Sequence, residues 1–254
     1  MKNLIKVAIL FFSFLADVNC GITESSSIKD VMLVAESAKA ENILVVFDID
    51  NTLARGKTPM ARDEFFSARI QSFMNNGMDF NQAIHHVLPD YYYIQFHSSL
   101  VLVEDEVLIL LQDLTNNGTK TLALTARSSY LAERTMDQLE SLGIRFNFFA
   151  EQNFTLNFGH PCFYKRGMLF CGLNDKGEAL LSLLDRLNYR PDLVIFVDDK
   201  YKNLLSVEME LLKREIPFEG LRLNVCDQDV MNFDLNKAEQ ELLEFKKSML
   251  CRLK

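Results

Sequence analysis

Apolar and polar residues follow one another in blocks whose spacing predicts helices and strands in turn. Apolar residues recur at helical spacing in four segments, residues 28–40, 104–118, 129–143 and 176–189. Apolar runs of strand length cover Ile43 to Phe47 and residues 119–125, 145–150 and 191–199. Because each run follows a helical segment, the pattern predicts βαβ units. The predicted fold class is therefore α/β, a three-layer, Rossmann-like parallel sheet with helices on both faces.

A long segment separates the first predicted strand from the second. Residues 55–99 have helical patterns of their own and exceed what a direct βαβ crossover needs. We therefore expect a small helical cap inserted after the first strand, and a core domain made of residues 21–54 and 100–254. Tyr91, Tyr92 and Tyr93 lie in this insertion. They either pack inside the cap and against the core or form a platform for a substrate.

The first twenty residues differ from the rest of the chain. Two lysines precede and flank a short apolar run, Val7 to Ala16. This order is typical of a secretory signal, and the run is too short to span a bilayer. We therefore expect residues 1–20 to be a signal peptide, followed by a polar lead at residues 21–27. The mature protein would be periplasmic or secreted, without a stable membrane span; a lipid anchor on Cys20 and a first helix of the mature domain are the alternatives.

Composition and charge narrow the class of protein. The chain has 254 residues, of which 48% are hydrophobic and 24% charged, and this is ordinary for a globular protein with one core and a small insertion. The formal net charge is -8, and lysines and arginines do not cluster. A nucleic acid is therefore not expected as a partner, whereas a small substrate held through a metal ion is compatible with this charge. The oligomeric state stays open.

The cysteines suggest a bridge rather than a metal site. None of the cysteines after residue 20 has the CxxC spacing of a zinc site. Arg166 and Gly167 predict a two-residue hairpin turn, which places Cys162 opposite Cys171. The α-carbons of a non-hydrogen-bonded pair approach to about 4.5 Å, a distance that a disulfide tolerates. Export would supply the oxidising compartment. We therefore consider a Cys162–Cys171 disulfide, with two reduced thiols as the alternative.

Polar side chains stand where the predicted strands end. The carboxyl ends of parallel strands meet at one edge of a sheet, where ligands bind. Two of the residues at this edge, Asp48 and Asp50, are separated by a single residue, and carboxylates this close repel each other unless a cation lies between them. Oxygen ligands such as these suit Mg²⁺. The pattern predicts phosphoryl transfer with Mg²⁺ as cofactor, in which a carboxylate attacks phosphorus as a covalent nucleophile. The residues at this edge are Asp48, Asp50, Thr125, Asp198 and Asp199, with Lys176 opening the helix before the last strand.

Four short motifs resemble those of the haloacid dehalogenase-like (HAD) superfamily. In chain order they are DIDNT, LALTAR, NDKGEAL and VDDKYKN, and the resemblance covers about residues 43–210. It implies that Asp48 is the nucleophile and Asp50 the general acid and base. It also implies that Thr125 and Lys176 hold the phosphoryl oxygens. Lys200 is a rival for this last role.

The same resemblance implies a magnesium site. Asp48, the backbone carbonyl of Asp50 and Asp199 would hold the ion, and Asp198, beside Asp199 in the fourth motif, is a further candidate ligand. Asn203 matches the end of that motif.

Arg127 stands in the triplet TAR, which resembles exported acid phosphatases of this superfamily. It is therefore expected to contact the substrate. The alternative is a surface ion pair with Glu133.

The residue two positions after the nucleophile distinguishes reaction types. A carboxylate there can protonate a leaving alkoxide and then deprotonate water, as a phosphomonoester requires. Asp50 therefore favours a phosphatase or phosphotransferase over a dehalogenase. We expect a magnesium-dependent hydrolase of small phosphomonoesters that forms an aspartyl-phosphate on Asp48. The alternative is an exported protein of this fold that binds a partner or acts as an effector, with little or no turnover.

Overall fold

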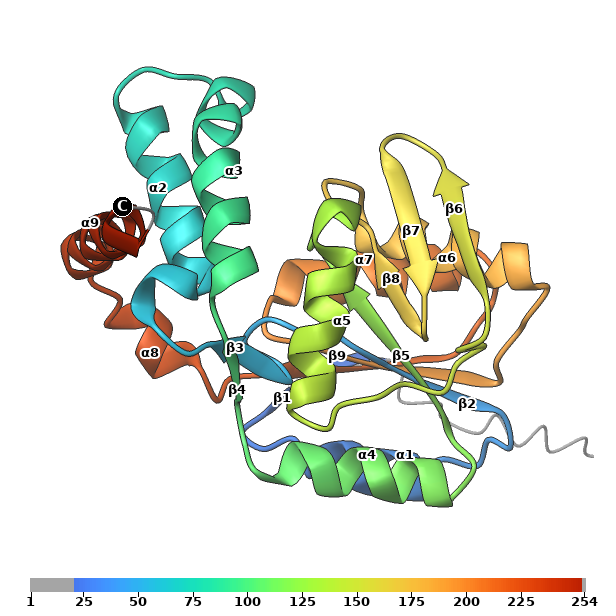
Figure 1. Cartoon of the computed structure of the whole chain (residues 1–254). Coiled ribbons are helices and arrows are strands. Elements are labelled where there is room, and N and C mark those ends of the chain that lie inside the picture. Colours follow the sequence, from blue (N-terminus) through green and yellow to red (C-terminus); the bar gives the residue numbers. More distant parts are fainter. Residues whose placement is uncertain (1–20, 253–254) are drawn as a thin grey trace, which may run out of the picture.

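The computed structural model describes residues 21–252 and shows a sheet between two layers of helices (Figure 1). Its strands are β1 (Gly21–Ser25), β2 (Ile43–Phe47), β5 (Lys120–Thr125), β6 (Asn153–Asn157), β7 (Pro161–Lys165), β8 (Met168–Phe170), β9 (Leu193–Asp198) and β10 (Phe218–Leu223). Within these residues the sheet order is β1-β10-β9-β2-β5-β8-β7-β6. Neighbours are parallel from β1 to β8 and antiparallel from β8 to β6. The predicted α/β class is confirmed.

Helices cover both faces of this sheet. One face carries α1 (Asp30–Ser37), α4 (Glu106–Asn116) and α5 (Ala132–Ser141), and the other carries α6 (Lys176–Leu187) and α7 (Tyr201–Leu212). On β2, Val45 and Phe47 belong to the first core and Leu44 and Val46 to the second. Side chains alternate along a strand, so a strand buried on both faces needs a continuous apolar run. The helical segments predicted from the sequence are confirmed as α1, α4, α5 and α6.

The sheet differs from the prediction at two places. Residues 145–150 form no strand, although Phe146 and Phe148 are buried; β8 lies beside β5 instead. The Asn147 side chain, rather than a strand ladder, accepts the Thr121 N–H at 2.8 Å. A short apolar run reports burial and does not fix the backbone conformation. Gly21–Ser25, expected as a polar lead, forms the edge strand β1 beside β10.

The hairpin predicted around Arg166 and Gly167 is confirmed. β7 and β8 pair antiparallel, with Lys165 opposite Met168. Both turn residues have positive φ angles, 51° and 72°. A two-residue hairpin turn requires this left-handed conformation, which glycine adopts without strain.

The disulfide considered from the sequence is wrong. Cys162 and Cys171 are free thiols. β8 ends at Phe170, and the Cys171 N–H donates to the Thr125 carbonyl on β5 at 2.9 Å. The last pair of the β7–β8 ladder is therefore Phe163 with Phe170. At the next residue, Cys171, the backbone bonds to β5, and the predicted pair of Cys162 with Cys171 does not form.

Between β2 and α4 the chain leaves the sheet. β3 (Ala54–Gly56) and β4 (Leu100–Leu102) form an antiparallel ribbon. The ribbon carries a short 3₁₀ turn, η1 (Pro59–Ala61), and two helices, α2 (Asp63–Asn75) and α3 (Phe80–His97). Figure 1 shows these two helices, the α2–α3 hairpin, standing beside the sheet as a separate projection.

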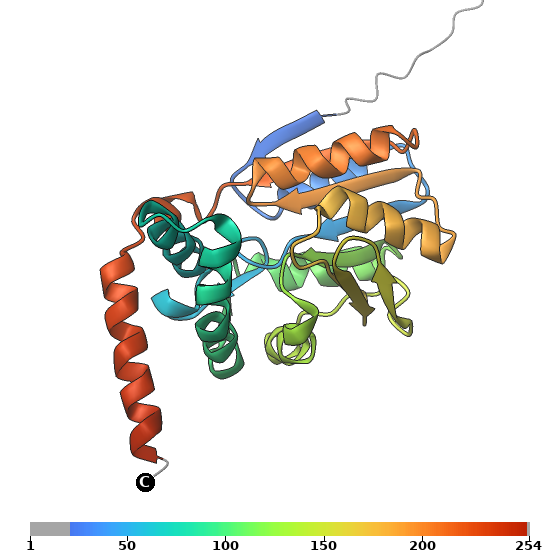
Figure 2. The ribbon, with the colours of Figure 1, turned by 90° about the horizontal axis from the view of Figure 1, so that it is seen from above.

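The last helix packs on the α2–α3 hairpin. α8 (Asp227–Met231) follows β10 and leads to α9 (Leu235–Arg252), which runs beside the hairpin and away from the sheet (Figure 2). Ala238 and Leu242 of α9 are buried in one cluster with Phe65 and Ile94. Ion pairs Arg69–Glu239 at 3.0 Å and Lys246–Asp90 at 2.5 Å lie alongside this cluster. By its contacts, α9 therefore belongs with the hairpin.

No helix within residues 21–252 is long and apolar enough to cross a membrane. The predicted signal peptide, residues 1–20, lies outside the described part of the chain.

Candidate active site

The first part of the site is the tight loop after β2. Asp48 and Asp50 are two residues apart, while Ile49 between them is fully buried in the core. The backbone N–H groups of residues 52–54 all donate to the Ile49 carbonyl, at 3.0 to 3.3 Å. The Asp48 N–H donates to the Val197 carbonyl at 2.9 Å. These bonds fix both carboxylates at the edge where the parallel strands end.

Lys176 lies between two carboxylates. Its Nζ is 2.7 Å from Asp48 Oδ1 and 2.7 Å from Asp198 Oδ2. All three side chains are buried. Burial acts to lower the pKa of Lys176, but Asp198 and Asp48 outweigh it and raise the pKa above its ordinary value. The ammonium therefore stays charged and bridges the ends of β2 and β9.

The start of α6 is fixed against α7, and this places Lys176. Asp175 caps α6 by accepting the Glu178 N–H at 3.1 Å. A Cβ at Gly177 would lie 2.3 Å from the Ser206 carbonyl oxygen, so only glycine allows the two helices to approach this closely. The Gly177 N–H also donates to Ser206 Oγ at 3.0 Å. Because α7 follows the Asp198–Asp199 pair, this contact brings Lys176 to those carboxylates.

The two adjacent aspartates have different surroundings. Asp198 accepts hydrogen bonds from Lys176 Nζ, the Lys200 N–H and Asn203 Nδ2, at 2.7 to 3.0 Å. Asp199 Oδ1 is buried and has no hydrogen-bond partner among the described residues. The hydrogen bonds that Asp198 can accept are thus provided by the protein, whereas Oδ1 of Asp199 is left available to another ligand.

Asp48, Asp198 and Asp199 form a cluster of carboxylates. One oxygen of each lies within 4.8 Å of the others. Burial is the largest cause that raises the pKa values of Asp48 and Asp199, and the neighbouring carboxylates raise them further. Buried carboxylates that repel one another fit a hard divalent cation, which would offset the repulsion and give Asp199 Oδ1 the partner that it lacks among the described residues.

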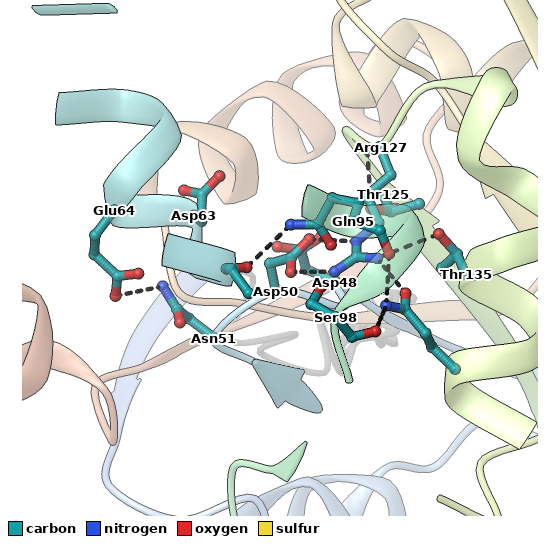
Figure 3. Close-up of polar contacts among 12 residues, drawn as sticks. Asp48, Asp50, Asn51, Asp63, Glu64, Gln95, Ser98, Thr125, Arg127 and Thr135 are labelled. Atoms are coloured by element: carbon teal, nitrogen blue, oxygen red, sulfur yellow. Dashed lines mark hydrogen bonds and ion pairs between the residues drawn. The ribbon is translucent and has the colours of Figure 1, made fainter. Parts of the chain in front are cut away.

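Asp50 makes a two-pronged ion pair with Arg127 (Figure 3). Arg127 Nε donates to Asp50 Oδ2 at 2.8 Å, and Nη2 donates to Oδ1 at 2.7 Å. Nη1 donates to Thr135 Oγ1 at 3.3 Å and to Gln138 Oε1 at 3.0 Å. Burial acts to raise the pKa of Asp50, but Arg127 outweighs it and lowers the pKa below its ordinary value.

The partners of Arg127 differ from those expected. Its side chain is 1% exposed and its guanidinium is engaged on all three nitrogens. Glu133 pairs with Lys165 at 2.5 Å, so the alternative of an Arg127–Glu133 surface pair is wrong. Thr125, at the end of β5, is buried, and its Oγ1 accepts the Arg127 N–H at 3.1 Å.

Several residues of the site escaped the sequence analysis. Asp63, the first residue of α2, pairs with Lys200 at 2.6 Å, so this ammonium is held by the hairpin. Glu64 Oε1 accepts from Asn51 Nδ2 at 3.2 Å (Figure 3). Gln138 donates from Nε2 to the carbonyls of Gln95 and Ser98, at the end of α3. These partners lie 13 to 137 residues apart, and no local pattern signals such pairs.

A cavity of about 250 Å³ lies between the α2–α3 hairpin and the loops at the sheet edge. Asp50 and Arg127 form part of its wall, and Tyr91 and Tyr92 face them from α3. Tyr93 instead packs on Phe245 of α9, with ring centroids 5.7 Å apart. Of the three tyrosines, two therefore line the cavity and one joins the hairpin to α9.

The fold and the site define an α/β protein with buried carboxylates and a buried lysine at the carboxyl edge of a parallel sheet. Residues 24–251 match the model of a family described as "Protein of unknown function (DUF2608)", and the chain belongs to this family.

Similar proteins occur in chlamydiae. A "Putative outer membrane protein" of Chlamydia trachomatis serovar D is 27% identical over 71% of this chain and 68% of its own length. A protein of the same description from Chlamydia pneumoniae is 26% identical over 84% of this chain and 82% of its own length.

Among solved structures, the chain is similar to a haloacid dehalogenase-like hydrolase of Streptococcus pneumoniae, with a TM-score of 0.43 and 12% identity over 70% of this chain and 92% of that one. A HAD-superfamily hydrolase of Geobacter sulfurreducens has a TM-score of 0.41 and 16% identity over 77% and 99%.

Proposed function

We propose that the protein is a magnesium-dependent hydrolase of small phosphomonoesters that works through a covalent aspartyl-phosphate on Asp48. The observation that carries the proposal is the convergence of Asp48, Lys176 and Asp199 at one buried edge. Each of these groups has a use in phosphoryl transfer, and burial strengthens their electrostatic effect. The four motifs that resemble the HAD superfamily support the same reaction.

Asp48 and Asp199 would hold Mg²⁺, together with the backbone carbonyl of Asp50. The bound ion would neutralise charge on the phosphoryl group and on the carboxylates around it. Asp199 Oδ1 suits this role because it is buried and has no hydrogen-bond partner within residues 21–252. Asp198 already accepts from Lys176 and Asn203, so we assign it to holding Lys176 in place.

In the first step a carboxylate oxygen of Asp48 attacks phosphorus, and the bond from phosphorus to the alcohol oxygen breaks. Asp50 gives its proton to the leaving oxygen. Lys176 and Thr125 contact the phosphoryl oxygens and offset their charge. In the second step water attacks the same phosphorus, Asp50 takes a proton from it, and inorganic phosphate leaves. Asp48 is restored as a carboxylate.

Arg127 has a positioning role in this proposal. Its two hydrogen bonds to Asp50 fix the orientation of that carboxylate, and its remaining contacts to Thr135 and Gln138 tie the guanidinium to α5. By lowering the pKa of Asp50, Arg127 favours the ionised form that takes a proton from water, and it makes the protonated form that the first step requires less populated but a stronger acid.

Export forms a second part of the proposal. The order of charged and apolar residues in segment 1–20 is that of a signal peptide, and relatives in two chlamydial species are named as outer membrane proteins. We propose a periplasmic or secreted enzyme with the α2–α3 hairpin as its cap. An exported binding or effector protein without turnover is the competing function, and the same assay separates the two.

The test is phosphate release from a panel of small phosphomonoesters by the protein without residues 1–20, with Mg²⁺ and with EDTA. We expect turnover with Mg²⁺ only. Asp48→Asn should lower kcat by about 10⁴-fold or more, because the covalent route is removed. Asp137→Asn, a matched change at an exposed position of α5, should leave the rate unaltered. Wild-type protein without turnover, or a fully active Asp48→Asn variant, would contradict the proposal.

A further inference from the structure

We infer that the substrates are phosphomonoesters of uncharged aromatic alcohols. This inference rests on the proposed function and names the leaving group that the cavity selects. The cavity adjoins Asp50, the proposed proton donor, so the group that departs with the proton must lie within it. Its remaining walls therefore decide which alcohol fits.

Those walls are mainly apolar and partly flat. Phe66 of α2 and Tyr91 of α3 lie side by side, with ring centroids 4.5 Å apart. Leu88 and Ile84 extend this wall along α3, and Leu173, in the loop after β8, faces the same cavity. Rings pack well on aromatic and branched aliphatic side chains, through burial and through edge or offset contacts. Against this wall the hydroxyl groups of a polyhydroxylated alcohol such as a sugar would lose water without gaining partners, whereas the polar side chains of Ser128, Ser129 and His160 line other parts of the cavity.

The charges in the walls act against anionic leaving groups. Asp50 and Asp63 contribute carboxylates to the cavity. Among the described residues that line it, Arg127 is the only one with a guanidinium or an ammonium group, and this guanidinium is engaged by Asp50, Thr135 and Gln138. Asp50 and Asp63 are paired with Arg127 and Lys200, so a second phosphate or a carboxylate on the leaving group would find neither an unengaged guanidinium nor an unengaged ammonium group there, and only the imidazole of His160 is left to face it.

Size and closure restrict the leaving group further. A volume of about 250 Å³ lies below the range of about 300–1,000 Å³ typical of pockets for drug-sized ligands. The hairpin also contacts the core beside the cavity: Tyr92 packs on Tyr130 with centroids 4.8 Å apart, and its hydroxyl donates to Ser128 Oγ at 3.3 Å. The single ring of the leaving group fits such a space better than a long chain does.

The experiment compares benzyl phosphate with glycerol 3-phosphate in the presence of Mg²⁺. Both esters release a primary alcohol, so their bonds to phosphorus differ little in reactivity. The ratio of their kcat/KM values therefore measures how well the cavity accepts each leaving group. We expect wild type to prefer benzyl phosphate by at least about tenfold, the scale of a small apolar contact. Leu173→Ser should reduce this ratio by about three- to tenfold, because the wall loses apolar area. Leu173 is 58% exposed, so the variant should fold.

The matched control is Leu212→Ser. Leu212 is 73% exposed at the end of α7 and does not line the cavity. This variant should keep the wild-type ratio. Equal kcat/KM values for the two esters in wild type, or a ratio that Leu173→Ser does not change, would overturn the inference and leave the proposed function standing.

A second readout separates the two hypotheses if no ester is hydrolysed. The proposed function then fails, and calorimetric titration of benzylphosphonate and methylphosphonate into the protein with Mg²⁺ tests the cavity by binding alone. Benzylphosphonate that binds at least about tenfold tighter supports the aromatic preference. Equal affinity for the two phosphonates overturns it.

Discussion

The sheet edge and the α2–α3 hairpin face each other across one cavity, and they are built from opposite kinds of contact. At the sheet edge, the buried side chains of Lys176 and Arg127 meet carboxylates at 2.7 to 2.8 Å, so charges hold one another in place. On the hairpin side, Phe66, Tyr91 and Leu88 offer apolar surface.

This difference indicates separate roles for the two walls of the cavity, the sheet edge and the α2–α3 hairpin. A preorganised charged site can change a reaction rate by many powers of ten, whereas an apolar wall distinguishes ligands by about 10- to 200-fold. We therefore expect the sheet edge to determine the reaction and the hairpin to determine the substrate. Changes of the same chemical kind on the two walls should consequently differ greatly in effect.

The largest effect should come from removing one carboxylate on each wall. Asp50→Asn keeps the shape of the side chain but cannot carry the proton, so kcat should fall by about 10²- to 10⁴-fold. Asp63→Asn, its matched counterpart on the hairpin, should change kcat by less than about tenfold, because it loses only a half-exposed pair with Lys200. Steady-state phosphate release measures both variants.

Stability needs a control in this comparison, because Asp50 is the partner of the buried Arg127. Breaking such a pair can cost about 3–5 kcal/mol, although Asn can still accept one of the two hydrogen bonds. Thermal denaturation should show a folded Asp50→Asn protein at the assay temperature. If that folded variant retained the wild-type kcat, or if Asp63→Asn lost as much activity, the proposed division of work would be wrong.

The next largest effect should separate Asp199 from Asp198. Asp199→Asn replaces a carboxylate whose Oδ1 has no hydrogen-bond partner in the described part of the chain, so Mg²⁺ affinity should fall by about 10- to 100-fold. The fall is measured as loss of the rise in Tm that saturating Mg²⁺ produces in wild type. Asp198→Asn should instead lower Tm with or without Mg²⁺, because Lys176 loses one of its two buried counter-charges. The reverse pattern would reassign the metal to Asp198.

The same two walls differ in how much of their structure could be predicted from the sequence. Strands β2, β5 and β9 are central and buried on both faces; β2 and β9 appear as unbroken apolar runs and β5 as the shorter run 122–124 between two threonines, and a polar residue follows each run. Parallel strands align their carboxyl ends, so the sequence alone predicts that the side chains at these ends lie close together, with Lys176 at the start of α6. The central sheet and its carboxyl edge were therefore predictable.

Features that depend on distant packing were not predictable. Phe146 and Phe148 are as apolar as strand residues, yet they fill the core from a loop. The register of the β7–β8 hairpin is local and was predicted, whereas the course of the chain at Cys171 depends on β5 and was not. The Asp63–Lys200 pair likewise needs the hairpin to fold back over the sheet edge. A single sequence carries little information about such contacts.

The smallest effect concerns Glu64, which joins the root of the hairpin to the catalytic loop. Glu64 is buried and accepts from Asn51 Nδ2 at 3.2 Å, while its Oε2 and Asn51 Oδ1 have no hydrogen-bond partner among the described residues. Burial is the main cause that raises the pKa of Glu64 above its ordinary value. The folded protein therefore binds a proton at Glu64 more strongly than the unfolded chain does, and the free energy of unfolding falls as pH rises through the folded-state pKa.

Glu64→Gln removes this titration and keeps an acceptor for Asn51. The variant should gain stability relative to wild type as the pH rises from about 4 to about 8, by less than about 1 kcal/mol, because one partly satisfied buried group is involved. Urea denaturation at the two pH values measures the gain, and Glu36→Gln, at an exposed position of α1, is the matched control without such a change. A stability difference between wild type and Glu64→Gln that is the same at both pH values would show that Glu64 carries its charge in the folded protein as readily as in the unfolded chain.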